Sequence, residues 1–176
     1  MDAVSENARN IVAEELEALK QRIIARHRQA GQVASGKTIA SLRVEKTADG
    51  GTLYGRPAFG TLETGRKPGR VPQNFETVIK QWILDKGISV TPIPYIRQPS
   101  ARWTPKYTPE ERGLNTLAGA IAYKIRTEGT TLYRHGGRSD IYSPEIPITV
   151  GSLRKRMLGL FKTEVELINI NSNENA

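Results

Sequence analysis

Apolar residues recur at helical spacing in the first part of the chain. Over residues 3–29 an apolar stripe steps by four, three and four positions, which places its members on one face of a helix. The stripe consists of Val12, Leu16, Leu19 and Ile23. Acidic residues precede basic ones along this segment, an order that complements the helix dipole, and Gly31 is expected to end the helix. At about 1.5 Å per residue the helix is ~40 Å long, which is more than one compact domain needs.

Three further segments show the same periodicity. Helices are predicted over residues 74–86, 114–127 and 149–163. Their expected apolar faces are Phe75, Val78, Ile79, Trp82 and Ile83 in the first, Leu117, Ala118, Ile121 and Ile125 in the second, and Leu153, Met157, Leu160 and Phe161 in the third. Residues 165–170 fit either a continuation of the last helix or an edge strand, and the polar residues 171–176 fit a frayed tail.

The segment after the first helix has the pattern of a β-hairpin. A short helical turn leads into a strand at about residues 42–47, Asp49-Gly50-Gly51 is a hairpin turn signal, and residues 52–56 form the returning strand. A short helix is predicted over about residues 58–64, because Gly65 is a terminator and a proline follows soon after.

Two stretches lack any periodicity. Residues 89–113 contain five prolines together with cations and aromatic residues, and residues 129–143 are polar and rich in glycine. Such stretches indicate functional loops, arms or disordered segments. Within the first, Glu110 and Glu111 follow a proline, which is typical of a helix start. We expect one domain over residues 1–176, with a Pro-rich arm or loop at about 89–113 and a polar loop at about 129–143.

Composition excludes several classes of protein. The 176 residues include no cysteine, which excludes thiol catalysis, cysteine-based zinc sites, iron–sulfur clusters and disulfide scaffolds. No apolar run is long enough to span a bilayer, and the first 21 residues lack the apolar region of a signal peptide. We therefore expect a soluble protein made in a cytoplasm, with no membrane partner. The net charge of +8 favours an anionic partner, most simply nucleic acid.

One short motif matches a phosphate-binding loop. Residues 31–38 read Gly-Gln-Val-Ala-Ser-Gly-Lys-Thr, a pattern in which backbone N–H groups and a lysine hold phosphate and the last hydroxyl holds magnesium. That site requires a buried strand before the first glycine, whereas the charged end of a helix precedes Gly31 here. No buried strand that ends in aspartate follows either. We interpret Gly31 as a helix stop and Lys37 as a solvated side chain.

Candidate catalytic groups are sparse. The two histidines are His27, which follows the basic end of the first helix and is expected to be exposed, and His135, which lies in the polar loop. Asp140 and Glu145 are loop carboxylates of the kind that holds magnesium in nucleases, but nothing in the sequence fixes their geometry. We expect no catalytic residue, no cofactor and no bound metal.

Two stretches carry the excess positive charge. Residues 56–70 have a net charge of +3 and residues 97–138 a net charge of +5. Flexible basic side chains contact phosphate without reading bases, although they also fit acidic patches on a neighbouring protein. The candidates for contact with DNA or another anionic partner are Arg66, Lys67, Arg70, Arg97, Arg102, Lys106, Arg134 and Arg138.

Three short segments carry a resemblance to a known family. They are Ser35-Gly36-Lys37-Thr38-Ile39-Ala40-Ser41-Leu42-Arg43-Val44, Leu53-Tyr54-Gly55 and Phe59-Gly60-Thr61-Leu62-Glu63-Thr64-Gly65. With the long first helix before them, residues 3–87 resemble the small neck proteins that join head to tail in tailed bacteriophages, often called head–tail connector or tail-completion proteins. Lys86-Gly87-Ile88 and the ending over residues 141–170 look most like the neck ring proteins of crAss-like phages.

The resemblance implies an α+β fold, in which the long N-terminal helix and further helices pack on a small antiparallel sheet with long irregular loops. It implies a structural protein of the virion, made in the cytoplasm of the bacterial host, that forms a ring of twelve or six copies at the head–tail junction. Its partners would be further copies of itself, the portal protein, other neck or tail proteins and the double-stranded DNA that passes through the channel. The candidates for contacts between subunits are Tyr95, Trp103, Tyr107 and Tyr133.

Other classes of function stay open. A nucleic-acid-binding protein that acts free in the cytoplasm would bind with an affinity that falls steeply as salt rises. A metal-dependent nuclease or a nucleotidase would need a constellation of site residues that is not intact here. The irregular stretches at 89–113 and 129–143 are also larger than in compact members of the neck family.

Overall fold

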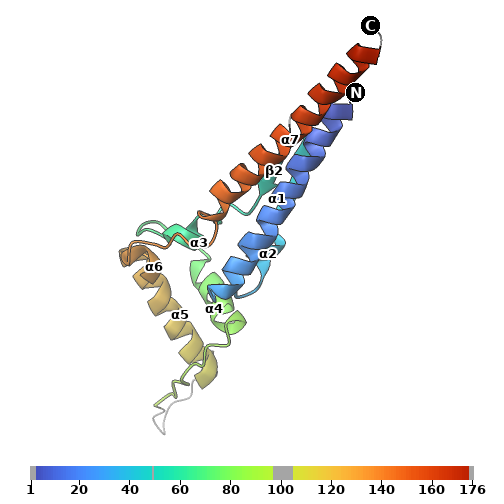
Figure 1. Ribbon diagram of the computed structural model, residues 1–176. Coiled ribbons are helices and arrows are strands. Elements are labelled where there is room, and N and C mark those ends of the chain that lie inside the picture. Colours follow the sequence, from blue (N-terminus) through green and yellow to red (C-terminus); the bar gives the residue numbers. More distant parts are fainter. Residues whose placement is uncertain (1–2, 49, 97–104, 175–176) are drawn as a thin grey trace. The chain divides into compact units, whose positions relative to one another are not determined.

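The computed structural model describes residues 3–48, 50–96 and 105–174, which form an α+β fold of helices and one two-stranded antiparallel sheet (Figure 1). The chain divides into two compact units. Unit 1 consists of Met1–Glu63 and Arg138–Ala176, and unit 2 consists of Thr64–Gly137. The sequence predicted one domain over residues 1–176, and within this range the structure distinguishes two compact units, of which unit 1 is built from both ends of the chain.

Two long helices form most of unit 1. α1 (Ala3–Gln29) and α7 (Glu145–Glu174) lie side by side and run in opposite directions, so that the start of α1 and the end of α7 are neighbours (Figure 1). The bounds of α1 are those predicted from the sequence. Gly31 follows it with a φ of +65°, a left-handed conformation that favours glycine and ends the helix as expected.

α7 is longer than its sequence pattern predicted. It begins at Glu145 rather than at residue 149, and it continues through residues 165–170 and the expected frayed tail as far as Glu174. Pro147 lies in its first turn, where a backbone N–H has no acceptor within the helix, so proline is tolerated there. Sequence periodicity missed this start because it begins among two prolines.

A β-hairpin packs against α1. α2 (Lys37–Ala40) leads into β1 (Arg43–Thr47), which pairs antiparallel with β2 (Gly50–Tyr54) in the register Arg43↔Tyr54 to Thr47↔Gly50. β2 is the returning strand, and it begins two residues before the predicted start at residue 52. α3 (Thr61–Thr64) is shorter than the helix predicted over residues 58–64. A Cβ at Gly51 would lie 2.9 Å from Leu16 Cδ1, so glycine at this position lets β2 approach α1 closely.

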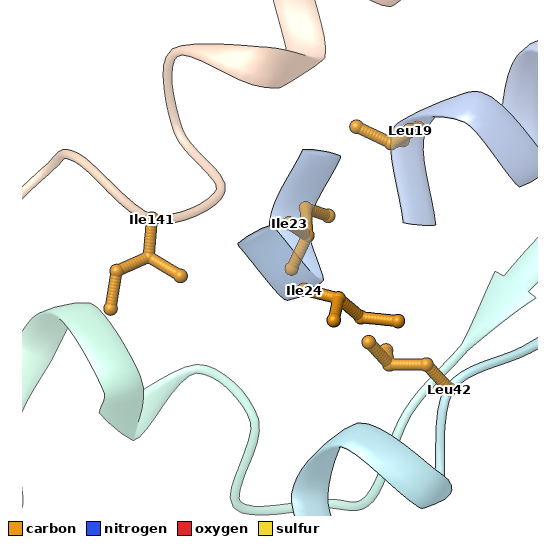
Figure 2. Close-up of a cluster of buried hydrophobic side chains, with 5 residues drawn as sticks. All are labelled: Leu19, Ile23, Ile24, Leu42 and Ile141. Carbon is orange, nitrogen blue, oxygen red and sulfur yellow. The ribbon is translucent and has the colours of Figure 1, made fainter. Parts of the chain in front are cut away.

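Distant parts of the sequence form the core of unit 1. The buried side chains are Leu19, Ile23 and Ile24 of α1, Leu42 at the start of the hairpin, and Ile141 (Figure 2). His27 is also buried, so the prediction that it is exposed was wrong. It lies one helical turn after Ile23 and therefore on the same, inward face, whereas its basic neighbours in sequence lie on other faces.

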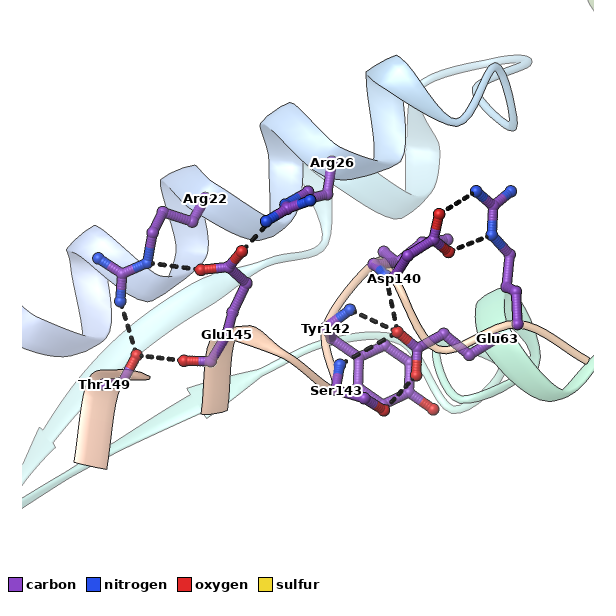
Figure 3. Close-up of polar contacts among 10 residues, drawn as sticks. Arg22, Arg26, Glu63, Asp140, Tyr142, Ser143, Glu145 and Thr149 are labelled. Carbon is purple, nitrogen blue, oxygen red and sulfur yellow. Dashed lines mark hydrogen bonds and ion pairs between the residues drawn. The ribbon is translucent and has the colours of Figure 1, made fainter. Parts of the chain in front are cut away.

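A buried carboxylate joins the two chain segments of unit 1. The Glu63 residue of α3 is 3% exposed, and its carboxylate accepts hydrogen bonds from the backbone N–H groups of Ile141, Tyr142 and Ser143 at 2.8, 2.7 and 3.0 Å (Figure 3). The Ser143 hydroxyl donates to the same carboxylate. The Glu63 carbonyl accepts a hydrogen bond from the Arg138 N–H at 2.8 Å. Glu63 thus binds the end of the first segment to the start of the second.

The environment of Glu63 shifts its pKa. Burial by itself would raise the pKa, but the hydrogen bonds from the Ser143 hydroxyl and from the three N–H groups outweigh burial and hold the pKa below the ordinary value of 4.5. The unfolded chain therefore binds a proton more readily than the folded one. The ionised carboxylate stabilises the fold fully above the unfolded pKa, and that contribution is lost as the pH falls through the folded pKa.

Unit 2 is built on two helices. α4 (Phe75–Asp85) and α5 (Pro109–Glu128) pack through Ile79 and Ile83 of α4 and Ala118 and Ala122 of α5. Val78 and Trp82 were expected in this core, but they are 51% and 39% exposed. The partly buried residues that pack against this core are Phe75, Val90, Leu114, Leu117, Ile121 and Ile125, so Val78 and Trp82 lie at the edge of the predicted apolar face of α4.

α5 begins five residues before the periodic segment predicted from residue 114, and the helix-start pattern of Glu110 and Glu111 after a proline is confirmed. The Thr108 hydroxyl accepts a hydrogen bond from the Glu111 N–H, and the Glu111 carboxylate accepts one from the Thr108 N–H, so that both groups at the helix start are satisfied. Pro109 takes the first helical position, which its fixed φ favours. The first irregular stretch therefore ends at residue 108 rather than 113, and the second contains a short helix, α6 (Thr131–Arg134).

Replacement of Glu63 tests the junction of unit 1. We expect Glu63→Gln to lower the free energy of unfolding by about 2 kcal/mol at pH 7, because hydrogen bonds to a charged acceptor are stronger than neutral ones. Urea unfolding followed by circular dichroism measures this. The difference from the wild type should shrink as the pH falls below 4.5 and through the folded pKa of Glu63.

A suitable control is Glu45→Gln. Glu45 is an exposed hairpin residue whose carboxylate pairs with Arg43 at 2.6 Å on the surface, so its loss should change stability little. Equal losses at Glu45 and Glu63 would contradict a special role for the buried carboxylate.

Candidate interaction surfaces

Residues 65–70 of unit 2 lie against the end of α5 and the start of α6. The Gly69 N–H donates to the Arg126 carbonyl at 2.9 Å, and the Thr130 N–H donates to the Arg66 carbonyl at 2.9 Å. The Arg66 N–H in turn donates to Thr130 Oγ1 at 2.9 Å. These bonds hold a segment that has no regular structure in one position on the two helices.

Two glycines make this approach possible. A Cβ at Gly65, which has a φ of +68°, would collide with the Tyr133 backbone nitrogen and lie 2.7 Å from Thr130 Oγ1. A Cβ at Gly129, which has a φ of +83°, would lie 2.7 Å from the Arg66 carbonyl oxygen. Both positions therefore need glycine for its backbone conformation and for its lack of a side chain.

The same arrangement joins segments that carry six cations of unit 2, which we call the basic cluster. They are Arg66, Lys67 and Arg70 of the segment 65–70, Lys124 and Arg126 at the end of α5, and Arg134 of α6. Glu128 is the one acidic residue in these stretches of sequence. Four of the eight cations predicted as anion contacts therefore lie in one place. Lys124 and Arg126 were not predicted, although basic residues in the last turns of a helix are a recognisable signal.

Members of the basic cluster differ in what they contact. An Arg66 guanidinium nitrogen donates to the Arg70 carbonyl at 2.7 Å, and the guanidinium lies 5.4 Å from the centre of the Phe75 ring. Arg134 pairs with Glu128 at 3.0 Å. These two arginines hold the cluster together. Three other members, Lys67, Arg70 and Lys124, are exposed and have no ion pair among the residues that the structure describes.

The remaining predicted cations are not members of the basic cluster. Lys106 precedes the other end of α5, ~30 Å along a 20-residue helix from the cluster. Arg138 belongs to unit 1, where two of its guanidinium nitrogens bind Asp140 at 2.5 and 2.7 Å. The Arg138 side chain lowers the pKa of Asp140 by this hydrogen bonding. Arg97, Arg102 and Trp103 lie outside the described residues.

The aromatic candidates have different surroundings. The Arg112 guanidinium lies 4.5 Å from the centre of the Tyr95 ring and donates to the Pro94 carbonyl at 2.9 Å, which holds this part of the Pro-rich stretch on α5. Gly113 of α5 packs so closely against Thr91 that a Cβ there would collide with the Thr91 carbonyl oxygen. Tyr107 and Tyr133 are both partly exposed, as a contact residue must be.

Charged and polar residues fill the contact between α1 and α7 in unit 1. The Glu145 carboxylate, which is buried, pairs with Arg22 at 2.9 Å and with Arg26 at 3.0 Å (Figure 3). Arg22 also donates to the Thr149 hydroxyl at 2.7 Å. Further along, the Glu15 carboxylate accepts hydrogen bonds from Ser152 at 2.8 Å and Arg156 at 3.1 Å. α7 thus turns its most polar face toward α1.

Apolar side chains lie on the opposite face of α7, and we call them the apolar stripe of α7. They are Ile146, Val150, Leu158, Phe161 and Val165, each between 49% and 64% exposed. At ~100° per residue they share one arc, roughly opposite the residues that contact α1. Leu153, Met157 and Leu160 lie between the two faces and are half-buried. Phe161, which the sequence placed on the same apolar face as these three residues, is exposed.

The motifs weighed for chemistry have local partners instead. Gly31 ends α1 and α2 has only four residues, so no strand-to-helix loop surrounds the phosphate-loop motif. Asp140 and Glu145 bind arginines rather than facing one another. Among the described residues no group of three or more acidic or histidine side chains is arranged to hold a metal, and none of the described helices is long and apolar enough to cross a bilayer.

Comparisons with protein-family models, with curated proteins and with solved structures give no match for this chain.

Two glycine substitutions test how residues 65–70 are held. Gly65→Ala and Gly87→Ala both place alanine at a similar positive φ, +68° and +63°, but nothing lies within 4 Å of a Cβ at Gly87. We expect Gly65→Ala alone to reduce hydrogen-exchange protection of the Gly69 and Thr130 amides, by ~10-fold or more, because overpacking costs about 1–3 kcal/mol. Equal effects of both variants on these amides would contradict the close approach.

Proposed function

We propose that this chain is a structural protein of a tailed-bacteriophage virion that forms a ring at the head–tail junction. It joins the portal protein to other neck or tail proteins, surrounds the channel through which double-stranded DNA passes, and performs no catalysis. It is made in the cytoplasm of the bacterial host. The resemblance of residues 3–87 to neck proteins motivates the proposal. The observation that carries it is the apolar stripe of α7.

The apolar stripe indicates a helix that requires a partner. A surface helix of a monomer turns its apolar side chains inward and its charges outward. α7 does the reverse, since its charged face meets α1 and five large apolar side chains face away from it. Contiguous exposed apolar side chains of this kind are typical of protein–protein contacts. An assembling protein accounts for this arrangement better than a free monomer.

A second copy of the chain is the partner that the charges favour. Arg154 lies within the arc of the apolar stripe, and the exposed Lys155 and Lys162 lie near it. The first half of α1 carries exposed acids, Glu6 and Glu14, which pair within the chain with Arg9 and Arg156 and remain accessible. Each copy therefore presents exposed cations beside the stripe and exposed carboxylates, paired within the chain, on its first helix. Contacts between two different surfaces of the chain repeat from one copy to the next. They close into a ring when the rotation between neighbouring copies fits, and the proposed ring has twelve or six copies.

Substitutions in the stripe test assembly. Leu158→Gln with Phe161→Gln should abolish any ring species, because large side chains at the centre of an interface contribute about 2 kcal/mol or more each. Native mass spectrometry over a range of protein and salt concentrations measures the species present. The control is Val78→Gln with Leu84→Gln, which replaces two similarly exposed apolar residues of α4, and it should leave the ring unchanged.

Two results would overturn the proposal. One is a ring that survives in the Leu158 and Phe161 variant, since the stripe then plays no part in assembly. The other is a wild-type chain that stays monomeric under all these conditions. A monomer would favour the second candidate function, a free nucleic-acid-binding protein, which the basic cluster supports.

A further inference from the structure

The division into two units separates the charges of the chain. Residues 64–137, which form unit 2, contain 12 lysines and arginines against 5 acidic residues. The two segments of unit 1 together contain 14 against 13. Unit 2 therefore carries a net charge of +7 out of +8, and unit 1 is almost neutral. The sequence places the excess charge in residues 56–70 and 97–138, and the structure adds that most of these residues belong to one compact unit.

We propose that unit 2 is the DNA-binding part of the molecule and that its basic cluster binds the phosphate backbone of double-stranded DNA without reading the bases. This deepens the proposed function, on which it rests for the presence of DNA beside the protein. The binding itself is a property of the single chain, so it can be measured whether or not a ring forms.

Several cations in the basic cluster are exposed, and no carboxylate among the described residues neutralises them. Backbone hydrogen bonds hold the segment 65–70 on α5 and α6. The Arg66 side chain binds the Arg70 carbonyl and the Arg134 side chain pairs with Glu128, so both side chains are held in place. Lys67, Arg70 and Lys124 are left exposed on this platform with no carboxylate partner among the described residues. These three exposed cations, carried by segments that hydrogen bonds hold together, are available to contact phosphates.

DNA fits this surface better than an acidic protein does. A duplex presents one phosphate about every 3.4 Å along each strand, so neighbouring cations all find partners, and the release of counterions drives binding. Exposed pairs with single carboxylates of a protein contribute little each. The cations lie on an irregular segment and at the C-terminal end of a helix, not along a helix that enters a groove. Contacts to phosphate are therefore expected, without preference for a sequence.

The test compares two triple variants with the same loss of charge. Lys67→Gln, Arg70→Gln and Lys124→Gln remove the exposed cations of the cluster. Arg28→Gln, Lys37→Gln and Arg56→Gln remove three exposed cations of unit 1 that lie outside the apolar stripe of α7 and its basic surroundings. Fluorescence anisotropy with two labelled duplexes of ~30 base pairs and unrelated sequence measures affinity from 50 mM to 300 mM salt, and circular dichroism checks that both variants fold.

Clear differences are expected. The wild type should bind both duplexes equally, with an affinity that falls steeply with salt. The cluster variant should lose ~100-fold in affinity at 100 mM salt, and the slope of log K against log salt should fall in magnitude by about 2.7, that is by ~0.9 for each lost phosphate contact. The unit 1 variant should keep most of the affinity and the slope.

Several results would overturn the inference. They are no binding by the wild type at 50 mM salt, equal losses in the two variants, and a strong preference for one duplex sequence. Native mass spectrometry of the same samples shows whether a ring forms, so it distinguishes a failure of this inference from a failure of the proposed function. A ring that does not bind DNA overturns only the inference, whereas a DNA-binding monomer overturns only the ring.

Discussion

Unit 1 depends on a contact between two places that lie far apart in the sequence. The chain leaves this unit after Glu63 and returns at Arg138, so nothing in the local sequence fixes where the returning segment lies. The buried Glu63 carboxylate does so by accepting three backbone N–H groups and one hydroxyl of residues 141–143. A charge in such a place is very costly unless its hydrogen bonds are complete, which makes the position of the returning segment specific.

This contact determines where Ile141 and the start of α7 lie. Ile141 enters the core beside α1, and four residues later Glu145 meets Arg22 and Arg26 at the start of α7. These pairs set the polar face of α7 against α1. The apolar stripe is left facing away, where the proposed ring uses it. The surface offered for assembly is thus a consequence of how the polar side chains are satisfied inside unit 1.

Much of the local structure was predictable. The bounds of α1, the helix stop at Gly31, the hairpin and the helix α4 follow from periodicity and turn residues, because these signals act over a few neighbouring positions. The start of α7 was missed because it lies near a proline, which the first turn of a helix tolerates, whereas the helix-start pattern at Glu110 and Glu111 was recognised but not joined to the periodic segment from residue 114. Four of the predicted cations form one cluster, but Arg138 pairs with Asp140 in the other unit, and sequence position alone does not separate these cases.

The sequence by itself determined which segments are helices, where the turns lie and how large the excess of positive charge is. Only the tertiary structure decided that Glu63 is buried, that His27 faces the core, that α7 shows its apolar side to the outside and that unit 2 holds the excess charge. The physical reason is the range of the interactions. Helix and turn formation depend on residues within a few positions of each other, whereas burial, hydrogen bonding and charge pairing here join residues more than 70 positions apart.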